Sequence, residues 1–133
     1  MAVAVPDGLL VPVVQETDKL GLKEIAEETS RLATAAREKK LSLAEMEGGT
    51  FSVTALGMFG VDAFTPVINP PNSGILGVGR IRDDVAWEGD IPIRVKRMTI
   101  SLTWDHRVLD GAPAAEFAAT IKKLLEQPLR LLG

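Results

Sequence analysis

The sequence predicts an α+β fold in which helices flank a mixed or mostly antiparallel β-sheet, and three observations predict it. An amphipathic pattern with helical spacing runs from residue 22 to about residue 40. Between residues 50 and 104 the pattern changes to short β-branched segments that are separated by glycine and proline. A second helical pattern runs from about Pro113 to Leu125. With 133 residues, of which 46% are hydrophobic and 25% charged, the chain has the size and composition of one globular domain.

Residues 1–14 predict a β-hairpin. Val3–Val5 form a short extended segment, and the Pro6-Asp7-Gly8 sequence that follows is typical of a turn. The apolar run Leu9–Val14 predicts the second strand, in which Pro12 indicates an edge position or the end of the strand.

The first helical pattern has recognisable ends. Lys39 and Lys40 carry the positive charge that suits a helix C-terminus. Ser42 predicts the cap of one further turn, because Glu45 stands three positions later and completes a capping box. Apolar and small residues recur at three- and four-residue steps along one face of the helix: Leu22, Ile25, Ala26, Thr29, Leu32, Ala33 and Ala36.

Three later segments predict strands. Thr50–Leu56 and Ile75–Ile81 are short and rich in apolar or β-branched residues. Lys96–Trp104 is expected to be one long strand, because apolar and polar residues alternate along it. Gly77 and Gly79 indicate close approach of another backbone, or a bulge, in the second segment. Turns are predicted at residues 57–61, 69–74 and 87–90.

Composition excludes several kinds of site. The chain has no cysteine, which excludes disulfides, thiol nucleophiles and cysteine-ligated metals. It has a single histidine, His106, so a metal site built from several histidines of one chain is also excluded, and no metal is expected. The net charge is −3, with basic residues scattered among carboxylates, so no nucleic-acid partner is expected. The apolar runs are too short to span a bilayer. We therefore expect no membrane association and a cytoplasmic location.

His106 is the first candidate catalytic residue, because it follows the strand predicted to end at Trp104. Imidazole titrates near neutral pH, so a positioned histidine is the commonest general acid or base; the alternative is an ordinary surface histidine. Asp110 is either a carboxylate that orients the histidine or the turn residue that Asp before Gly typically is. Thr54 alone is a hydroxyl in a segment that favours a strand. These residues leave open both an acid–base enzyme and an interaction module.

Four stretches, taken in order, resemble the dihydrolipoamide acyltransferases, the acyltransferase components of 2-oxo acid dehydrogenase complexes such as pyruvate dehydrogenase. Asp105–Ala112 resembles the His-Arg-x-x-Asp-Gly signature of that family. Gly48–Val61 is similar to its glycine-bounded strand. Phe64–Pro71, followed by Ile75–Gly79, is similar to its Asn-Pro-Pro loop and the next strand. Gly8–Val14 matches the family as well. The resemblance implies an α+β fold like that of chloramphenicol acetyltransferase.

The resemblance also implies a role for each matching residue. His106 would be the general base that takes the proton from the thiol of coenzyme A or of the dihydrolipoyl group. Thr54 stands where the family usually has a serine whose hydroxyl donates to the tetrahedral oxyanion. Asp110 would be the carboxylate that holds the active-site loop, and Leu76 would line the substrate channel.

The activity implied by the resemblance is transfer of an acyl group between dihydrolipoamide and coenzyme A. Coenzyme A and the lipoyl group are then substrates, the latter carried on a lipoyl domain of a partner chain. Family members form trimers, or multiples of trimers, whose active sites lie between subunits, with the histidine and the oxyanion hydroxyl on different chains.

One departure from the family leaves a second function open. We expect residues 1–133 to be a partial catalytic domain, truncated on its N-terminal side and without a lipoyl or peripheral-subunit-binding domain. The alternative to the enzyme is therefore a non-catalytic core or assembly fragment of such an acyltransferase.

Overall fold

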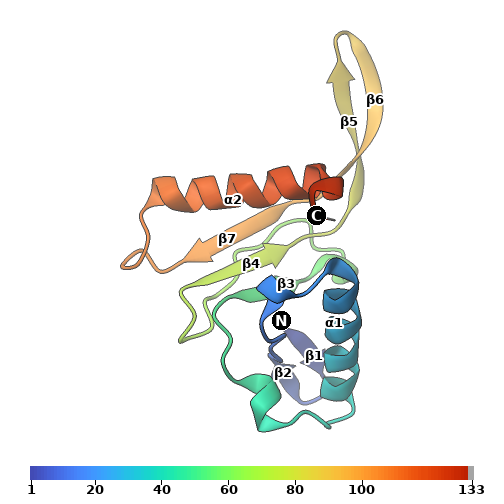
Figure 1. Ribbon diagram of the computed structural model, residues 1–133. Coiled ribbons are helices and arrows are strands. Elements are labelled where there is room, and N and C mark those ends of the chain that lie inside the picture. The colour runs from blue at the N-terminus through green and yellow to red at the C-terminus, as the bar shows by residue number, and fades with distance from the viewer. Residues whose placement is uncertain (132–133) are drawn as a thin grey trace.

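The computed structural model describes residues 1–131. Within them, two helices and three small sheets form the fold (Figure 1), and the combination of helices with parallel and antiparallel strands confirms the predicted α+β class. In the described residues, neither helix has the length and apolar character that crossing a membrane requires. The helices are α1 (Leu22–Arg37) and α2 (Gly111–Glu126), and the strands are β1 (Val3–Val5), β2 (Gly8–Leu10), β3 (Ser52–Ala55), β4 (Gly74–Val78), β5 (Arg82–Glu88), β6 (Ile91–Arg97) and β7 (Ile100–Trp104).

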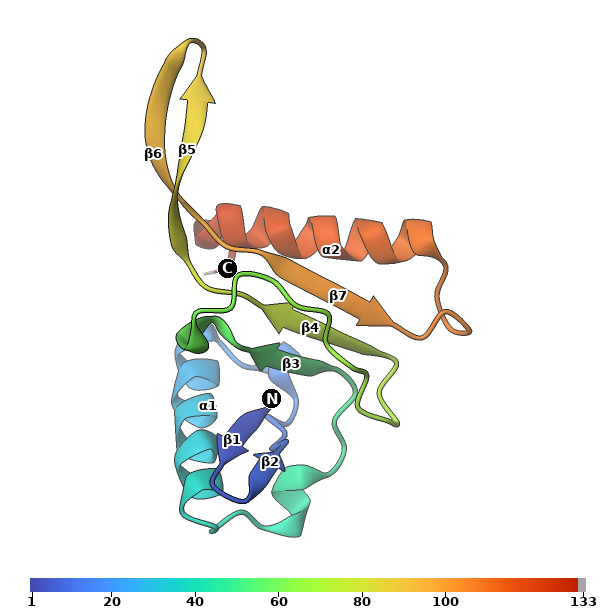
Figure 2. The same cartoon turned by 180° about the vertical axis from the view of Figure 1, so that it is seen from behind.

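The strand β4 is the centre of the three-stranded sheet that carries Thr54 and Leu76, two of the four candidate residues. It runs parallel to β3 and antiparallel to β7. Its side chains Ile75 and Leu76 are buried, with 6% and 8% of their surface exposed. The helix α2 lies along β7 in both ribbon views (Figures 1 and 2), so the helix that follows the His106 turn packs on the strand that precedes it.

The N-terminal elements pack beside β3. The predicted hairpin is confirmed as β1 paired with β2, although the second strand ends at Leu10 instead of reaching Val14. The backbone N–H of Ala2 donates to the carbonyl oxygen of Val53 at 2.9 Å, which ties this hairpin to β3. The helix α1 covers β1 and buries Leu32 and Ala36 completely.

The turn after α1 is capped as the sequence predicted. The backbone N–H and the hydroxyl of Ser42 both donate to the Glu45 carboxylate at 2.8 Å. Arg31 of α1 also reaches this carboxylate at 2.8 Å, so the capping box is fastened to the helix. The three contacts lower the pKa of the Glu45 carboxyl to about 2, the Ser42 hydrogen bonds being the larger cause.

The single long strand predicted for Lys96–Trp104 is wrong. The chain divides there into β6 and β7, with a break at Met98–Thr99. On the facing side, β4 ends at Val78 and β5 begins at Arg82. Three residues, Gly79–Ile81, therefore face two, and an extra residue of this kind bends a two-stranded ribbon. Beyond the bend, β5 and β6 pair as a hairpin that projects from the body of the molecule (Figures 1 and 2).

The close backbone approach predicted from the glycines is confirmed at Gly79. A Cβ atom at this position would collide with the carbonyl oxygen of Asp62. The neighbouring backbone is also hydrogen bonded. The Gly79 N–H donates to the carbonyl oxygen of Thr99 and the Arg80 N–H donates to the carbonyl oxygen of Val61, both at 2.9 Å. The loop that follows β3 is thereby fixed against the bend in the ribbon.

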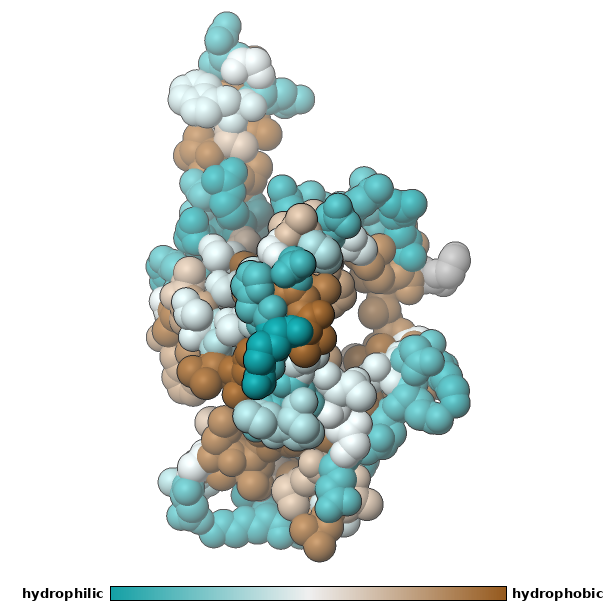
Figure 3. Space-filling model, turned by 90° about the vertical axis from the view of Figure 1, so that its left-hand side faces the viewer, coloured by the Kyte–Doolittle hydropathy of each residue, from teal (hydrophilic) through white to brown (hydrophobic). Residues whose placement is uncertain are grey.

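The folded chain leaves an unusually large surface exposed. Its accessible surface is 9417 Å², whereas a monomer of 14.3 kDa exposes about 6,800 Å² by the usual relation of surface to mass. Large apolar side chains contribute to the exposed surface, and Figure 3 shows brown surface on the projecting hairpin as well as on the body. Surface of this kind is typical of contacts with other protein. Large apolar side chains that are more than half exposed include Leu9, Leu43, Met58, Phe59, Val67, Ile81, Val85, Trp87, Ile91, Val108 and Leu129.

We predict that Leu32→Ala lowers the free energy of unfolding by about 2–5 kcal/mol, because it empties a fully buried site between α1 and β1. Urea-induced unfolding measures this difference. The matched control is Leu22→Ala on the same helix, where the side chain is 45% exposed and the loss should not exceed about 1 kcal/mol. Equal losses for the two variants would contradict the packing described for α1.

Candidate active site

His106 lies in the turn that connects β7 to α2. The strand β7 ends at Trp104, and α2 begins after its N-cap residue Asp110. The His106 side chain is 70% exposed, and its ring centroid lies 6.1 Å from that of the Trp104 ring. The predicted place of His106 at the exit of a strand is confirmed, and its ring is accessible to another molecule.

Hydrogen bonds within the turn give it a defined shape. Trp104 Nε1 donates to the carbonyl oxygen of Leu109 at 2.8 Å and closes the turn across its base. The Val108 N–H donates to the carbonyl oxygen of Asp105 at 2.9 Å. The Asp105 carboxylate accepts from the Arg107 backbone N–H at 2.9 Å and from Arg107 Nη2 at 2.6 Å. The imidazole is therefore carried on a turn that is braced on both sides.

The Asp105–Arg107 pair fixes the charges of the turn. The Arg107 guanidinium and backbone N–H hold the pKa of the Asp105 carboxyl at about 2, the side-chain hydrogen bonds being the larger cause. The same contacts raise the pKa of Arg107. Both groups are ionised at neutral pH, so the charge of Arg107 is balanced within the turn.

Asp110 lies near the imidazole but is not bonded to it in this chain. Its side chain is 87% exposed, and its Oδ1 lies 3.7 Å from His106 Nδ1, which is long for a hydrogen bond. As the N-cap of α2 its carbonyl oxygen accepts from Ala114, whereas its side chain makes no capping hydrogen bond. Within the described residues, Trp104 and Asp105 brace the turn, and a role for Asp110 in holding it stays a prediction.

Thr54 lies near the end of β3 and is half-buried. Its neighbour on β4 is Gly77, which presents no side chain. Phe64 and Pro66 fill that space, since a Cβ atom at Gly77 would meet them at 3.0 and 3.2 Å. The hydroxyl of Thr54 is therefore held on a strand whose neighbouring position is occupied by a loop.

The structure does not bring Thr54 and His106 together within one chain. Through the paired strands, Thr54 is level with Gly77 and Ser101. From Ser101, β7 runs three residues further to Trp104, a distance of about 10 Å along the strand, and His106 lies beyond it. Two strand spacings of about 4.8 Å also separate β3 from β7. No single carbonyl group can contact both side chains of one chain.

Leu76 occupies the middle of β4. It is 8% exposed and lies opposite Val53 on one side and Leu102 on the other. A place in the core of the sheet accounts for this burial, and a role in lining a substrate channel stays a prediction.

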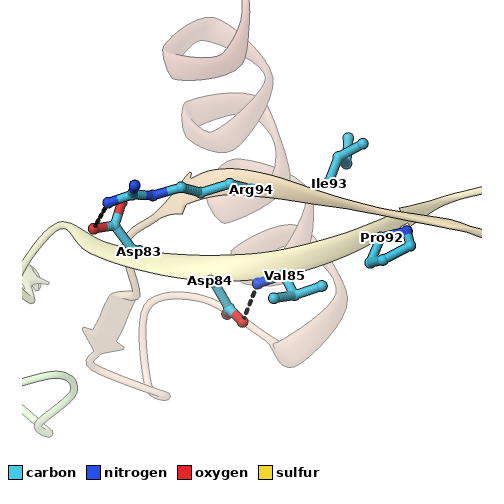
Figure 4. Close-up of a pocket in the computed structure, with 6 residues that line it drawn as sticks. All are labelled: Asp83, Asp84, Val85, Pro92, Ile93 and Arg94. Atoms are coloured by element: carbon cyan, nitrogen blue, oxygen red, sulfur yellow. Dashed lines mark hydrogen bonds and ion pairs between the residues drawn. The ribbon is translucent and has the colours of Figure 1, made fainter.

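A pocket on the β5–β6 hairpin lies apart from these residues (Figure 4). None of the four candidate residues lines it. Its charged groups are paired within the hairpin, because Asp83 accepts from Arg94 Nη2 at 2.6 Å and Asp84 accepts from the Val85 N–H at 2.8 Å. Nothing in the pocket indicates a reaction site. Its lining residues are Asp83, Asp84, Val85, Pro92, Ile93 and Arg94.

Sequence reasoning missed the two residues that shape the turn, Trp104 and Asp105. Each had a signal. An aspartate two positions before an arginine can bond the backbone of that residue and pair with its side chain, which Asp105 does with Arg107. The indole N–H of a half-buried tryptophan needs an acceptor, and the following turn supplies it.

The whole chain, residues 1–133, matches the family described as 2-oxoacid dehydrogenases acyltransferase (catalytic domain). The chain belongs to this family. The resemblance carried by the four sequence stretches is thereby confirmed.

Curated relatives of the acyltransferase family cover nearly the whole chain. The dihydrolipoyllysine-residue acetyltransferase component of the acetoin cleaving system of Bacillus subtilis is 47% identical over 132 residues. The dihydrolipoyllysine-residue succinyltransferase component of the 2-oxoglutarate dehydrogenase complex of Escherichia coli K12 is 43% identical over 133 residues. Both matches cover 99% of this chain and 33% of the relative, so the chain spans about a third of their length.

Solved acyltransferase structures share the fold. The dihydrolipoamide acetyltransferase of Azotobacter vinelandii and the cubic core of the pyruvate dehydrogenase multienzyme complex each give a TM-score of 0.93 at 40% identity, covering 99% of this chain and 54% of theirs. A probable dihydrolipoamide acetyltransferase from Listeria monocytogenes gives 0.88 at 41% identity, covering 95% of this chain and 54% of that one. These likenesses confirm the fold expected for the family.

The Azotobacter vinelandii structure bears on the candidate residues, because its study addressed the role of a serine, a histidine and an asparagine in the catalytic mechanism. The serine and the histidine of that enzyme are separated by the same number of residues as Thr54 and His106. Its histidine and asparagine are separated by the same number as His106 and Asp110. The three candidate positions therefore reproduce the spacing in the acetyltransferase.

We predict that Arg107→Gln makes the fold more sensitive to acid. The folded pKa of Asp105 is about 2, below the ordinary value of 3.8, so the ion pair stabilises the fold above about pH 4 and its contribution is lost as the pH falls to about 2. The difference in stability between wild type and Arg107→Gln should be largest above pH 4 and vanish near pH 2. Urea unfolding at a series of pH values measures it.

The control is Arg37→Gln, which removes an exposed arginine from the end of α1. A stability difference for Arg107→Gln that does not change between pH 2 and 5, or that equals the control, would contradict the ion-pair assignment.

Proposed function

We propose that this chain transfers an acyl group between dihydrolipoamide and coenzyme A as part of a 2-oxo acid dehydrogenase complex. The observation that carries the proposal is the spacing of Thr54, His106 and Asp110, which equals that of the three residues studied in the Azotobacter vinelandii acetyltransferase. The acyl group is left general, because relatives named for acetyl and for succinyl transfer are similarly close, at 47% and 43% identity.

His106 supplies the general base. A free thiol has a pKa of about 8.5 and is mostly protonated at neutral pH, so it needs a base to become a nucleophile. The imidazole takes the thiol proton, and the thiolate forms a bond to the carbonyl carbon of the thioester. When the tetrahedral intermediate collapses, its other carbon–sulfur bond breaks, and the departing thiolate takes the proton back from the imidazolium. The exposed ring of His106 allows two thiols to reach it in turn.

Thr54 and Asp110 support this chemistry from opposite sides. The carbonyl oxygen becomes negative in the intermediate, and the Thr54 hydroxyl donates a hydrogen bond to it; one such donor is typically worth about 3–4 kcal/mol of the barrier. The Oδ1 of Asp110 lies 3.7 Å from His106 Nδ1, and in the assembled site this carboxylate favours one orientation of the imidazole ring. Leu76 contributes to the wall of the substrate channel.

The active site is built from two chains. Because Thr54 and His106 of one chain lie too far apart to contact one carbonyl group, the hydroxyl at each site comes from a neighbouring copy. A two-fold dimer and a closed ring of three or more copies both meet this requirement. The resemblance to the family favours the trimer. The cubic core formed by a structural relative supports assembly from many copies. The lipoyl domain of a partner chain brings the acyl group to this site, in the cytoplasm.

The β5–β6 hairpin is the contact that we assign to the neighbouring copy. A two-stranded hairpin is marginally stable in water without a partner. Trp87 and Ile91 lie near its tip and are 69% and 66% exposed, and Val85 is 56% exposed. The surface in excess of a typical monomer, about 2,600 Å² by the surface–mass relation, is of the size that permanent interfaces bury.

We predict that His106→Ala lowers acyl transfer from an acyl-coenzyme A to dihydrolipoamide by about 10²–10⁴-fold, and Thr54→Ala by about 10²–10³-fold. Co-expressing the two inactive variants should restore activity. In randomly mixed rings, about a quarter of the sites combine the intact histidine of one chain with the intact threonine of the next. Turnover per active-site equivalent measures the recovery.

The matched control for this mixing experiment is His106→Ala co-expressed with the double variant, which leaves every site without its base. Mixed assemblies that are no more active than either variant alone would contradict a site shared between chains. A wild-type protein that assembles but transfers no acyl group would identify the chain as a non-catalytic assembly fragment.

We predict that Trp87→Ser weakens assembly, because it removes apolar surface from the hairpin without disturbing the core of the chain. Light scattering over a dilution series should show dissociation at higher protein concentration than for wild type. Leu43→Ser is the control, since Leu43 is 74% exposed and lies outside the hairpin, in the turn that follows α1. The assignment fails if both variants dissociate as the wild type does.

A further inference from the structure

Three segments meet at the end of the central sheet that carries the His106 turn. They are the start of β3, the loop of residues 69–73 and the residue that follows β7. The loop enters β4 at Gly74, which is buried and lies opposite Trp104. The loop therefore stands between the strand that carries Thr54 and the turn that carries His106.

Two hydrogen bonds fasten the loop to its two neighbours. On one side, Asn72 Nδ2 donates to the hydroxyl oxygen of Ser52 at 2.7 Å. Ser52 is only 3% exposed, and it is the buried polar residue of the described sheet. On the other side, the backbone N–H of Asp105 donates to the carbonyl oxygen of Ser73 at 2.8 Å. We call these two hydrogen bonds the Asn72 clasp.

The backbone of the loop is restrained, so a shift at its Ser52 contact is expected to shift its Asp105 contact as well. The Asn72 N–H donates to the carbonyl oxygen of Asn69 at 3.0 Å and closes a turn. Pro70 and Pro71 occupy the two central positions, where their rings restrict the backbone. Asn72 and Ser73 are adjacent, so a displacement of the Asn72 side chain from Ser52 also displaces the carbonyl group that holds Asp105.

We infer that Asn72 is a positioning residue for His106, acting through the Ser73 carbonyl oxygen and the Asp105 backbone. The inference rests on the proposed function, since it names a determinant of the same site. The other contacts of the turn, from Trp104 and Arg107, are internal to it or adjacent in sequence. The clasp supplies the contact between the turn and the β3 side of the sheet.

The clasp also reaches the strand of the second reactive group. Ser52 and Thr54 are two residues apart on β3, so their side chains lie on the same face of the strand. In a ring of copies, the His106 and Thr54 of one chain belong to two different active sites. Asn72 then helps to position the His106 of one site and the Thr54 of the other. Removing its side chain is expected to affect both sites.

The test is a double-mutant cycle on Ser52→Ala and Asn72→Ala in the assembled protein. Each variant removes one partner of the same hydrogen bond. We expect each to lower kcat by about 10–100-fold, because small misplacements of a catalytic group are costly, while KM for the acyl thioester changes by less than about twofold. The double variant should be no worse than the worse single variant, since both changes break one interaction. Ser30→Ala, the same substitution at an exposed position of α1, is the matched control.

A second measurement follows the imidazole without the acyl-transfer reaction. The chain has one histidine, so carbethoxylation by diethyl pyrocarbonate reports on His106 alone, with His106→Ala as the blank. A released turn should move the ring within the assembled site, so the rate for Asn72→Ala should differ severalfold from that of wild type while the mass of the assembly is unchanged.

The outcomes separate the clasp from the proposed function. The clasp is overturned if Asn72→Ala keeps both the kcat and the carbethoxylation rate of wild type. It is also overturned if kcat falls only in proportion to the loss of assembled protein. If wild type transfers no acyl group but the carbethoxylation rates still differ, the clasp stands and the proposed function fails.

Discussion

The opposite directions of β3 and β7 relative to β4 constrain everything else in this structure. Thr54 lies near the C-terminal end of β3, whereas His106 follows the C-terminal end of β7. These two ends lie at opposite edges of the sheet, because β3 and β7 run in opposite directions. A strand cannot slide to reduce this separation, because β4 is buried on both faces and a slip would disrupt the side-chain packing on each of them. The central residues Ile75 and Leu76 make that slip expensive. The hydrogen-bond register that stabilises the sheet therefore also keeps Thr54 and His106 apart.

Local signals were sufficient to predict the helices and the turns. The capping box at Ser42 needs only the four residues that form it, and Glu45 accepts both hydrogen bonds there. The first hairpin also follows from local sequence, and its second strand ends before Pro12 because proline lacks the N–H that a ladder requires. These elements depend on contacts between residues that are close in sequence.

The hairpin of β5 and β6 was not predictable in the same way. Alternation of apolar and polar residues continues from Arg97 to Trp104 without a break, so the sequence favours one strand. The break at Met98–Thr99 arises because the facing segment, Gly79–Ile81, has one residue more, and the pairing that reveals this is not local. For the candidate site, the resemblance to the family assigned roles to His106 and Thr54, and these roles stay predictions. The separation between the two residues follows only from the sheet register.

Assembly and catalysis should respond together to concentration. A chain that exposes 9417 Å², when its mass predicts about 6,800 Å², gains stability whenever a second copy covers the excess. In the proposed assembly, the same second copy supplies the Thr54 hydroxyl that each His106 lacks nearby. On this proposal, dilution removes stabilising contacts and complete active sites in one step. In the proposed mechanism, a more stable monomer would not gain activity. The separation between Thr54 and His106, which the register of β3, β4 and β7 sets, would remain.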